Sequence, residues 1–323
     1  MAEPDLDLSI VIPLLDEAES LPELHDWIQR VVERESLRYE ILFIDDGSSD
    51  NSWAIIEQLA ARNPAVCGIS FTRNYGKSAA LATGFRKVRG RVVITMDADL
   101  QDSPDEIPEL YRLIAEKNYH IVSGWKKKRY DNVFLKNIPS KFYNAVTRWI
   151  SGIKLHDFNC GLKAYDVRVV RSLQLYGEMH RYIPVLAKWS GFSRITEKVV
   201  AHRPRKYGVS KFGLERFVNG FLDLLSVTLI TRFRKKPMHF FGTLGILTFL
   251  VGLCFSVWII LEKQWAVYHS EPYREVVDQP LFFMALVAVM VGVQLFLAGF
   301  VAELIINTGD RNEYSVAKTV NLS

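Results

Sequence analysis

Apolar residues fill two long runs near the C-terminal end of the chain, residues 238–262 and 281–306, with almost no charge. At a rise of about 1.5 Å per residue, each run would form a helix of roughly 37–39 Å, long enough to cross a hydrocarbon core about 30 Å thick. Two buried helices of a large soluble core are the alternative, but such helices usually carry a polar stripe. The pattern therefore predicts a transmembrane hairpin.

The charges beside these runs orient the predicted hairpin. Arg232, Arg234, Lys235 and Lys236 come just before the first run, whereas the connecting loop carries more acidic than basic side chains. Since cytoplasmic flanks of membrane helices are rich in Lys and Arg, we expect the large preceding domain and the C-terminal tail to be cytoplasmic. The protein would then be an integral membrane protein. Its short acidic start is not expected to be a signal peptide.

Before residue 212 the pattern changes to short apolar runs that alternate with amphipathic segments. We expect strands at residues 8–14, 39–44, 66–71, 91–96 and 120–124, and helices at residues 20–35, 51–62, 78–87 and 103–117. Ser20 with Glu23, and Ser103 with Glu106, have the spacing of capping boxes. Strands that alternate with helices predict an α/β fold with a mostly parallel sheet, whose ligands bind beyond the carboxyl ends of the strands.

The chain thus divides into three parts. Residues 1–211 form the α/β domain, residues 212–237 an interfacial helix and basic linker, and residues 238–323 the hairpin with a short tail. Within the first part, apolar residues recur at helical spacing over about 138–152, with Lys141, Asn144 and Arg148 on the opposite, polar side. This spacing predicts an amphipathic helix, which would lie at the membrane interface or, alternatively, against the protein core. We expect the lipid bilayer to be a partner.

Composition changes this picture little. The net charge of +4 is modest, and we expect no nucleic-acid partner. The three cysteines, Cys67, Cys160 and Cys254, are widely spaced and indicate neither a disulfide framework nor a zinc site.

Acidic residues follow the predicted strand at 91–96. Asp97 and Asp99 are two residues apart, so in an extended segment both carboxylates face the same side, and Gln101 adds another oxygen. Oxygen ligands of this kind suit Mg²⁺ or Mn²⁺. Asp99 could instead cap the next helix, but Ser103 is the better placed cap. We therefore predict a divalent metal site at this strand end.

Two further polar stretches follow strands. Residues 45–50 predict a turn that leaves Asp46 free to accept from a base or ribose. Gly76, Lys77 and Ser78 imitate the end of a phosphate-binding P-loop, but that motif requires a glycine where this chain has Phe71. Lys77 is left as a possible ligand of a donor phosphate.

Seven stretches together resemble a known family. They are Pro13 with Asp16-Glu17, residues 45–50, 73–77, 97–101, 156–163, 180–184 and 205–211. They look like the family 2 glycosyltransferases of GT-A fold, and more narrowly like the dolichol-phosphate mannose synthase-like polyisoprenyl-phosphate glycosyltransferases. With the helix pair, the chain is most similar to the bacterial bactoprenol glucosyltransferases with two membrane helices. Asp16 departs from the family pattern, which usually has Asn there.

The resemblance implies a nucleotide-sugar donor, a divalent metal and a polyprenyl phosphate acceptor. It implies donor-binding residues Pro13, Asp16, Glu17, Asp46, Arg73, Lys77 and Asp97; metal ligands Asp97, Asp99 and Gln101; acceptor-phosphate ligands Lys126, Arg129, Arg205, Ser210 and Lys211; and catalytic residues Asp157 and Asp99. Asp157 would lie beside the anomeric centre as a base or an orienting group. For residues 126–129 a solvated loop is the alternative.

The implied reaction is an inverting transfer of a single sugar, glucose from UDP-glucose, to undecaprenyl phosphate on the cytoplasmic leaflet. The Q-x-x-R-W motif of processive synthases is absent from the sequence, which favours a single transfer. GDP-mannose or another UDP-sugar is the alternative donor. A non-catalytic membrane scaffold or transporter subunit is the alternative from a different class. We also expect a homo-oligomer.

Overall fold

The computed structural model describes residues 6–127, 138–175, 177, 179–204, 206 and 237–308, without the side chains of 138–143 and 306–308. The chain forms two compact units, Met1–Val227 and Thr228–Ser323. Nearly all of the predicted interfacial segment 212–237, and the tail after residue 308, lie outside the described residues.

A seven-stranded sheet forms the centre of the first unit, in the order β3-β2-β1-β4-β6-β5-β7. Its strands are β1 (Leu6–Leu14), β2 (Tyr39–Asp45), β3 (Val66–Ser70), β4 (Gly90–Thr95), β5 (Ile121–Trp125), β6 (Lys163–Asp166) and β7 (Ile195–Val199). Neighbouring strands are parallel except around β6, which runs antiparallel to β4 and β5. The sheet is therefore mostly parallel, as the sequence pattern predicts.

The reversed strand β6 decides which residues meet at one edge of the sheet. β4 and β5 end at this edge, but β6 begins there, with Lys163 paired opposite Thr95 of β4. The segment that leads into β6 therefore lies beside the segment that leaves β4.

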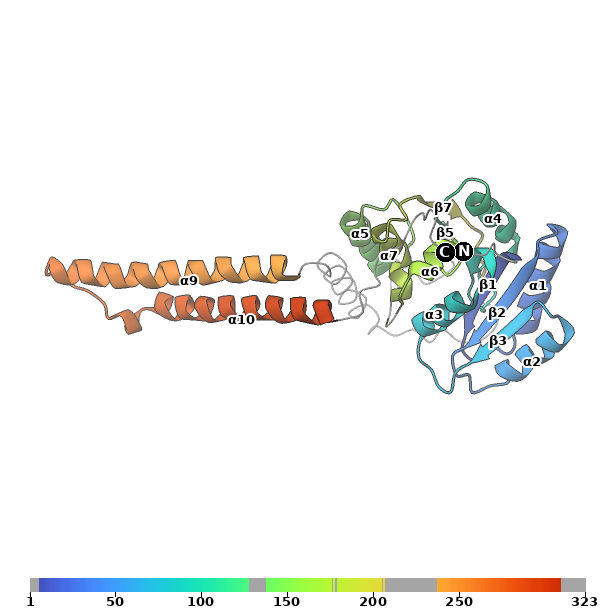
Figure 1. Cartoon of the computed structure of the whole chain (residues 1–323), viewed down its shortest axis with the longest axis horizontal. Coiled ribbons are helices and arrows are strands. Elements are labelled where there is room, and N and C mark those ends of the chain that lie inside the picture. The colour runs from blue at the N-terminus through green and yellow to red at the C-terminus, as the bar shows by residue number, and fades with distance from the viewer. Residues whose placement is uncertain are drawn as a thin grey trace, which may run out of the picture. The chain divides into compact units, whose positions relative to one another are not determined.

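Helices cover both faces of the sheet (Figure 1). One apolar core includes α1 (Leu21–Arg34), α2 (Ser52–Arg62) and α4 (Ile107–Ala115); the other includes α3 (Lys77–Lys87), α6 (Val167–Ser172), the 3₁₀ turn η3 (Met179–Tyr182) and α7 (Ile183–Trp189). Along β1, Ile10 and Ile12 belong to the first core and Val11 to the second, because successive strand residues face opposite sides.

Two helix starts differ from the prediction. The Ser20 hydroxyl donates to the Glu17 carbonyl at 2.9 Å, and the Ser103 hydroxyl donates to Asp105 Oδ2 at 3.1 Å, and neither caps a helix. The predicted capping boxes are wrong because each hydroxyl has an acceptor within its own turn. The second helix also starts late, at Ile107, after the 3₁₀ turn η1 (Pro104–Glu106).

The predicted amphipathic helix is present as α5 (Ile138–Ser151), but its sides differ from the expectation. Val146 and Ile150 pack against the second core. Asn144, expected on the outer polar side, is buried, and its Oδ1 accepts from the Phe158 backbone N–H at 3.3 Å. Trp149 is 85% exposed. The helix therefore buries part of its apolar stripe and presents Trp149 outward.

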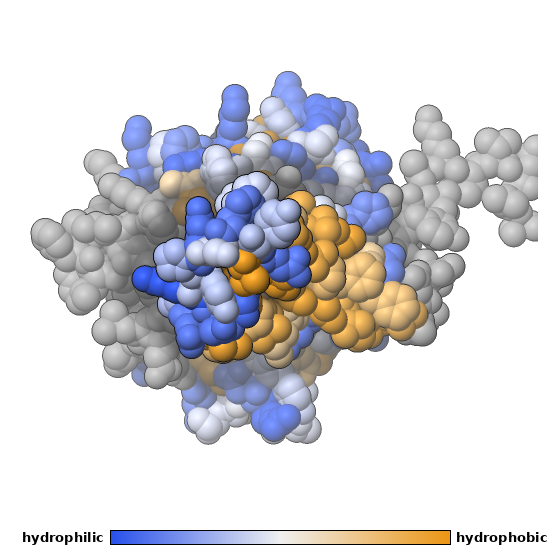
Figure 2. Space-filling view, turned by 90° about the vertical axis from the view of Figure 1, so that its left-hand side faces the viewer, coloured by the Kyte–Doolittle hydropathy of each residue, from blue (hydrophilic) through white to orange (hydrophobic). Residues whose placement is uncertain are grey.

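The second unit is a hairpin of α9 (Pro237–Tyr268) and α10 (Pro280–Thr308), with the 3₁₀ turn η4 (Val276–Asp278) between them (Figure 1). An added Cβ at Gly245 would lie 2.7 Å from the Gly292 carbonyl oxygen, so glycines let the two backbones touch. Both helices are long and apolar enough to cross a membrane. Figure 2 looks at the connecting end, where polar residues gather, with apolar residues along the helices behind.

Candidate active site

Asp16 fixes the loop after β1 against the loop after β2. Its φ of 54° is a left-handed conformation that Asp and Asn tolerate better than most residues. Its Oδ1 accepts from the backbone N–H and the hydroxyl of Ser49, at 2.8 and 3.1 Å, and its own N–H donates to Ser48 Oγ at 2.9 Å. An Asn side-chain oxygen could accept in the same way, so Asp in place of the usual Asn preserves this loop.

Asp46 links the loop after β2 to the loop after β3. Its two carboxylate oxygens accept from the backbone N–H groups of Tyr75 and Gly76, at 2.7 and 2.9 Å. The turn therefore does not leave Asp46 without partners, because backbone donors contact both of its oxygens, and its role in donor binding stays a prediction. Burial raises the pKa of Asp46, and the two N–H donors act in the opposite direction.

Three further predicted donor-site residues lie at or just beyond the carboxyl ends of β1 and β3. Pro13, near the end of β1, pairs with Ile44 of β2, and the Glu17 N–H donates to Ser52 Oγ at 3.0 Å. The Arg73 guanidinium lies over the Tyr75 ring, 4.9 Å from its centroid. The structure therefore brings these residues to one edge of the sheet.

Lys77, the first residue of α3, contacts Asp97 directly after β4. The start of α3 is held by His180, whose N–H donates to Ser78 Oγ at 3.0 Å. Burial alone would raise the pKa of Asp97, but the ammonium of Lys77, with the more distant Lys126, lowers it to about 2. Asp97 is therefore an ionised carboxylate held against a cation.

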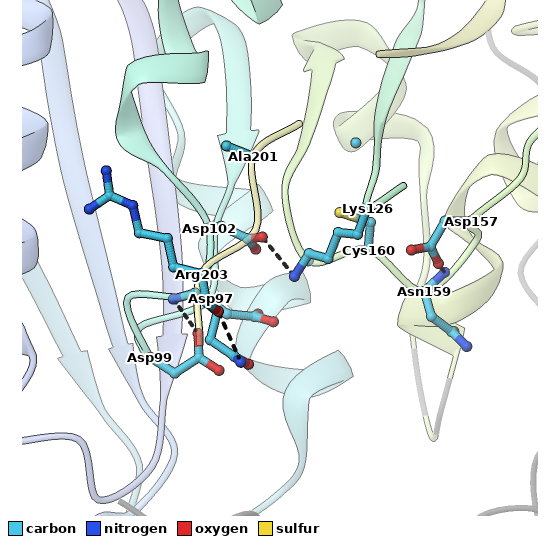
Figure 3. A network of polar contacts seen from close by, with 12 residues as sticks. Asp97, Asp99, Asp102, Lys126, Asp157, Asn159, Cys160, Ala201 and Arg203 are labelled. Carbon is cyan, nitrogen blue, oxygen red and sulfur yellow. Dashed lines mark hydrogen bonds and ion pairs between the residues drawn. The ribbon is translucent and has the colours of Figure 1, made fainter. Parts of the chain in front are cut away.

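The segment after β7 pairs with the segment that carries Asp99 and Gln101. Asp99 Oδ1 accepts from the Gln101 N–H at 3.2 Å, and the Gln101 carbonyl accepts from the Arg203 N–H at 2.9 Å. Asp102 and His202 form an antiparallel bridge one step further. Arg203 is therefore fixed beside the predicted metal ligands (Figure 3).

Asp102 and Lys126 form a buried ion pair beneath this segment. Lys126 Nζ lies 2.7 Å from Asp102 Oδ1, and the two side chains are 12% and 0% exposed (Figure 3). Burial raises the pKa of Asp102 despite Lys126, and the neighbouring carboxylates Asp97 and Asp99 act in the same direction. Lys126 was predicted to bind an acceptor phosphate, which would have to share its ammonium with Asp102.

Asp157 stands in the segment that leads into β6 and is buried. Its Oδ1 accepts from the Asn159 N–H at 3.0 Å, and its carbonyl accepts from the Ser123 hydroxyl at 3.2 Å. The Gly161 carbonyl accepts from Thr95 Oγ1 at 2.9 Å. The Asp157 segment is therefore attached both to β5 and to the end of β4.

Lys163 and Gly161 are residues of this site to which the sequence analysis assigned no role. Lys163 is buried and donates to the Cys160 carbonyl, and burial lowers its pKa. Cys160 is also buried, and burial raises the pKa of its thiol to about 12. The sequence feature that could have indicated a role for Lys163 is its place in the stretch 156–163, which resembles the family, at the start of β6.

The carboxylates after β4 fit a hard divalent cation. Among the described residues, no three His, Cys, Asp or Glu side chains gather around one point. The protein's ligands for such a cation would be the two carboxylates of Asp97 and Asp99 and the side-chain oxygen of Gln101. Mg²⁺ is commonly held by one or two carboxylates together with substrate phosphates. Asp97 is ionised, and a bound cation would share its carboxylate with the Lys77 ammonium.

Four predicted acceptor ligands, Arg129, Arg205, Ser210 and Lys211, lie outside the described residues. The other predicted site residues lie at or just beyond the carboxyl ends of the parallel strands, at the start of α3, or in the segment entering β6.

Comparison with known proteins now identifies the family. Residues 9–173, which span the sheet from β1 to β6, match the family described as "Glycosyl transferase family 2". The chain belongs to this family. The predicted family 2 membership is confirmed, and the chain is a glycosyltransferase rather than a scaffold or transporter subunit.

Two family 2 relatives match this glycosyltransferase over most of its length. "Dodecaprenyl-phosphate galacturonate synthase" of Rhizobium johnstonii is 33% identical over 96% of this chain and 90% of that protein. "Undecaprenyl-phosphate 4-deoxy-4-formamido-L-arabinose transferase" of Shewanella sediminis is 36% identical over 92% of this chain and 86% of that protein. Neither name contains glucose, the sugar implied by the resemblance to bactoprenol glucosyltransferases.

Solved structures of glycosyltransferases share the GT-A fold with this family 2 enzyme. Mannosyl-3-phosphoglycerate synthase of Rubrobacter xylanophilus aligns with a TM-score of 0.56 and 18% identity, covering 71% of this chain and 75% of that one. Glucosyl-3-phosphoglycerate synthase of Mycobacterium tuberculosis, solved with Mn²⁺ and UDP-glucose, aligns with a TM-score of 0.52 and 20% identity, covering 70% and 79%. The predicted fold is therefore confirmed.

Proposed function

We propose that this enzyme transfers one sugar from a nucleotide sugar to a polyprenyl phosphate at a membrane. The observation that supports this proposal most directly is the position of Asp97, which contacts Lys77 on one side and the Gly161 segment on the other. This contact joins the donor loops to the segment that holds Asp157. The names of the two long relatives and the apolar hairpin support a lipid-linked phosphate as acceptor.

The donor half of the site would use the loops after β1, β2, β3 and β4. We propose that Asp97, Asp99 and Gln101 hold Mg²⁺ or Mn²⁺, which when bound would stabilise the leaving diphosphate as a Lewis acid. Lys77, beside Asp97, would contact the same diphosphate by charge-assisted hydrogen bonds. Pro13, Asp16, Glu17, Asp46 and Arg73 would surround the nucleoside.

The acceptor half would need cations more than a base. A phosphate monoester has a second pKa near 6, so the acceptor is largely a dianion at neutral pH and a competent nucleophile. Its oxygen would form the new bond to the anomeric carbon as the bond to the diphosphate breaks, with inversion. Asp157 would orient the reacting groups, and Arg129, Arg205, Ser210 and Lys211 would bind the phosphate, with Lys126 shared between Asp102 and the acceptor.

The second unit would hold the enzyme where its lipid acceptor lies. We propose that α9 and α10 span the membrane, with the glycosyltransferase domain and the C-terminal tail on the cytoplasmic side, as the flanking charges favour. The exposed Trp149 on α5 would add an interfacial contact, because indole rings favour the membrane–water boundary.

For the donor we propose UDP-glucose, on the resemblance to bactoprenol glucosyltransferases. UDP-galacturonate is a second candidate, favoured by the 33% identical relative named for that sugar. GDP-mannose remains the alternative with a different base.

The test is transfer of radiolabelled sugar into extracted lipid. Membranes containing the full chain are incubated with undecaprenyl phosphate and, in separate reactions, labelled UDP-glucose, UDP-galacturonate or GDP-mannose. We expect one donor to label the lipid and the D99A variant to give none. If the label appeared only in free sugar, the proposed polyprenyl phosphate acceptor would be contradicted. If only GDP-mannose labelled the lipid, the proposed UDP-sugar donor would be contradicted.

A further inference from the structure

Lys163 is a buried lysine to which the proposed mechanism gives no role. It is the first residue of β6, and it pairs with Thr95 of β4 on one side and with Ser123 of β5 on the other. Because residues directly opposite each other on antiparallel strands share one face of the sheet, the three side chains form a row across these strands. All three residues are buried.

Each side chain of this row donates a hydrogen bond to a backbone carbonyl of the loop formed by residues 157–161. The Ser123 hydroxyl donates to the Asp157 carbonyl at 3.2 Å, the Lys163 ammonium to the Cys160 carbonyl, and the Thr95 hydroxyl to the Gly161 carbonyl at 2.9 Å. The loop contains no helix or strand, so its carbonyls need partners from outside regular structure. The row therefore determines the path of the loop backbone.

Lys163 is the charged member of the row. Hydrogen bonds from a charged donor are roughly twice as strong as neutral ones. Burial lowers the pKa of Lys163, whereas the carboxylates of Asp157 and Asp97 act in the opposite direction because they favour its charged form. The ammonium is therefore close to both carboxylates as well as to the loop that it holds.

The 157–161 loop carries two contacts of the proposed active site. Near its start, Asp157 Oδ1 accepts from the Asn159 N–H at 3.0 Å (Figure 3). At its end, Gly161 lies against the carboxylate of Asp97. A change in the path of the loop would therefore move Asp157 relative to Asp97.

We propose that Lys163 is a positioning residue for the sugar transfer: its ammonium, together with the hydroxyls of Thr95 and Ser123, fixes the 157–161 loop and thereby places Asp157 at the reacting centre. This inference rests on the proposed function, because it takes Asp157 to act there. Lys163 acts through the loop backbone and not on the substrates.

Transfer kinetics of the full chain in membranes test this role, with undecaprenyl phosphate and whichever of the three labelled nucleotide sugars the wild type uses. K163M keeps most of the side-chain volume and removes the donor. We expect kcat to fall about 10-fold to 100-fold, because small displacements of a catalytic group are costly, while the donor dissociation constant stays within about 2-fold. An unchanged kcat in K163M would overturn the proposal.

K198M is the matched control for K163M. Lys198 is also a largely buried lysine on a strand, but its ammonium contacts Glu106 and Glu109 and not the 157–161 loop. We expect K198M to keep kcat within about 2-fold of the wild type. A loss in K198M as large as that in K163M would show that removal of any such lysine has this effect, and would overturn the specific role of Lys163.

A double-variant cycle with D157N separates positioning from a general loss of structure. If Lys163 acts through Asp157, K163M should lower kcat by less than about 2-fold when residue 157 is already Asn. Losses that multiply in K163M/D157N would overturn the proposal. K163Q, which is shorter and keeps an uncharged donor, is carried through the same cycle with the same criterion, so that the result does not depend on the folding of one variant.

The same measurements distinguish this inference from the proposed function. A wild-type kcat in D157N would overturn the positioning role together with the role of Asp157. A wild-type enzyme that labels no lipid with any of the three nucleotide sugars would contradict the proposed function itself.

Discussion

Gly161 lies against Asp97 so closely that a Cβ added to the glycine would be 2.4 Å from Asp97 Oδ2. The segment entering β6 and the end of β4 thus share a surface with no room for another carbon atom. The position of a proposed metal ligand therefore depends on a glycine that lies next to the Asp97–Asp99 motif in space but 62 residues after Asp99 in the sequence.

We expect G161A to lower kcat/KM by about 100-fold, because displacing a catalytic group by about 1 Å can cost that much. The measurement is steady-state transfer to lipid. G124A is the matched control, since its Cβ would meet Cys160 and Leu162 rather than Asp97. Comparable thermal unfolding of the two variants, with equal activity loss in both, would contradict a specific effect through Asp97.

Removing a carboxylate at position 99 should abolish turnover without unfolding the enzyme. We expect D99A to retain the wild-type melting temperature within a few degrees and to show no transfer, and we expect chelation of divalent ions to silence the wild type reversibly. D105A, which removes an exposed carboxylate in the same region, serves as the control. Full activity in chelator would refute the proposed metal requirement.

The buried pair of Asp102 and Lys126 should contribute strongly to folding. Removing one partner leaves an uncompensated buried charge, so we expect D102L and K126M each to lower the free energy of unfolding by about 3–5 kcal/mol. The double variant D102L/K126M should recover part of that loss. Denaturant titration measures all three. Additive losses in the double variant would show that the two side chains do not interact.

Asp157→Asn keeps the shape of the side chain and removes its charge. We expect kcat to fall about 10-fold or more while the donor dissociation constant stays within a factor of about two, because the loss would affect orientation at the reacting centre. Single-turnover kinetics and donor titration separate the two quantities. An unchanged kcat would remove Asp157 from the active site.

Deleting residues 238–323 should separate donor binding from use of the lipid. We expect the remaining domain to bind nucleotide but to transfer poorly to polyprenyl phosphate in vesicles, and to keep more of its activity on a short, water-soluble prenyl phosphate. Wild-type rates on the vesicle acceptor would show that the hairpin is dispensable for transfer.

Local pattern predicted β1 to β5, the helices between them and the C-terminal hairpin, because each has a clear apolar period. It did not predict β6 and β7. β6 is four residues long with Lys163 and Asp166 at its ends, and β7 has the polar centre Thr196-Glu197-Lys198. Their place in the sheet is set by pairing with strands distant in the sequence, and the spacing of apolar residues along the chain gives no information on that pairing.

The candidate site divides in the same way. Asp97, Asp99 and Gln101 could be found because they follow a strand directly. The Asp102–Lys126 pair, the Gly161 contact and the buried Lys163 depend on the reversed direction of β6 and on the fold bringing residues 102, 126 and 161 together. The backbone donors to Asp46 could not be predicted, because they come from the loop after the next strand.

The pairing of Gln101 and Asp102 with residues 202 and 203 has a thermodynamic consequence. The backbone that carries the proposed metal ligands is tied to the backbone that continues into the proposed acceptor motif, 205–211. We therefore expect a displacement of one segment on ligand binding to displace the other. Binding free energies linked in this way are reciprocal, so whatever factor the nucleotide sugar adds to lipid affinity, the lipid must return to the nucleotide sugar.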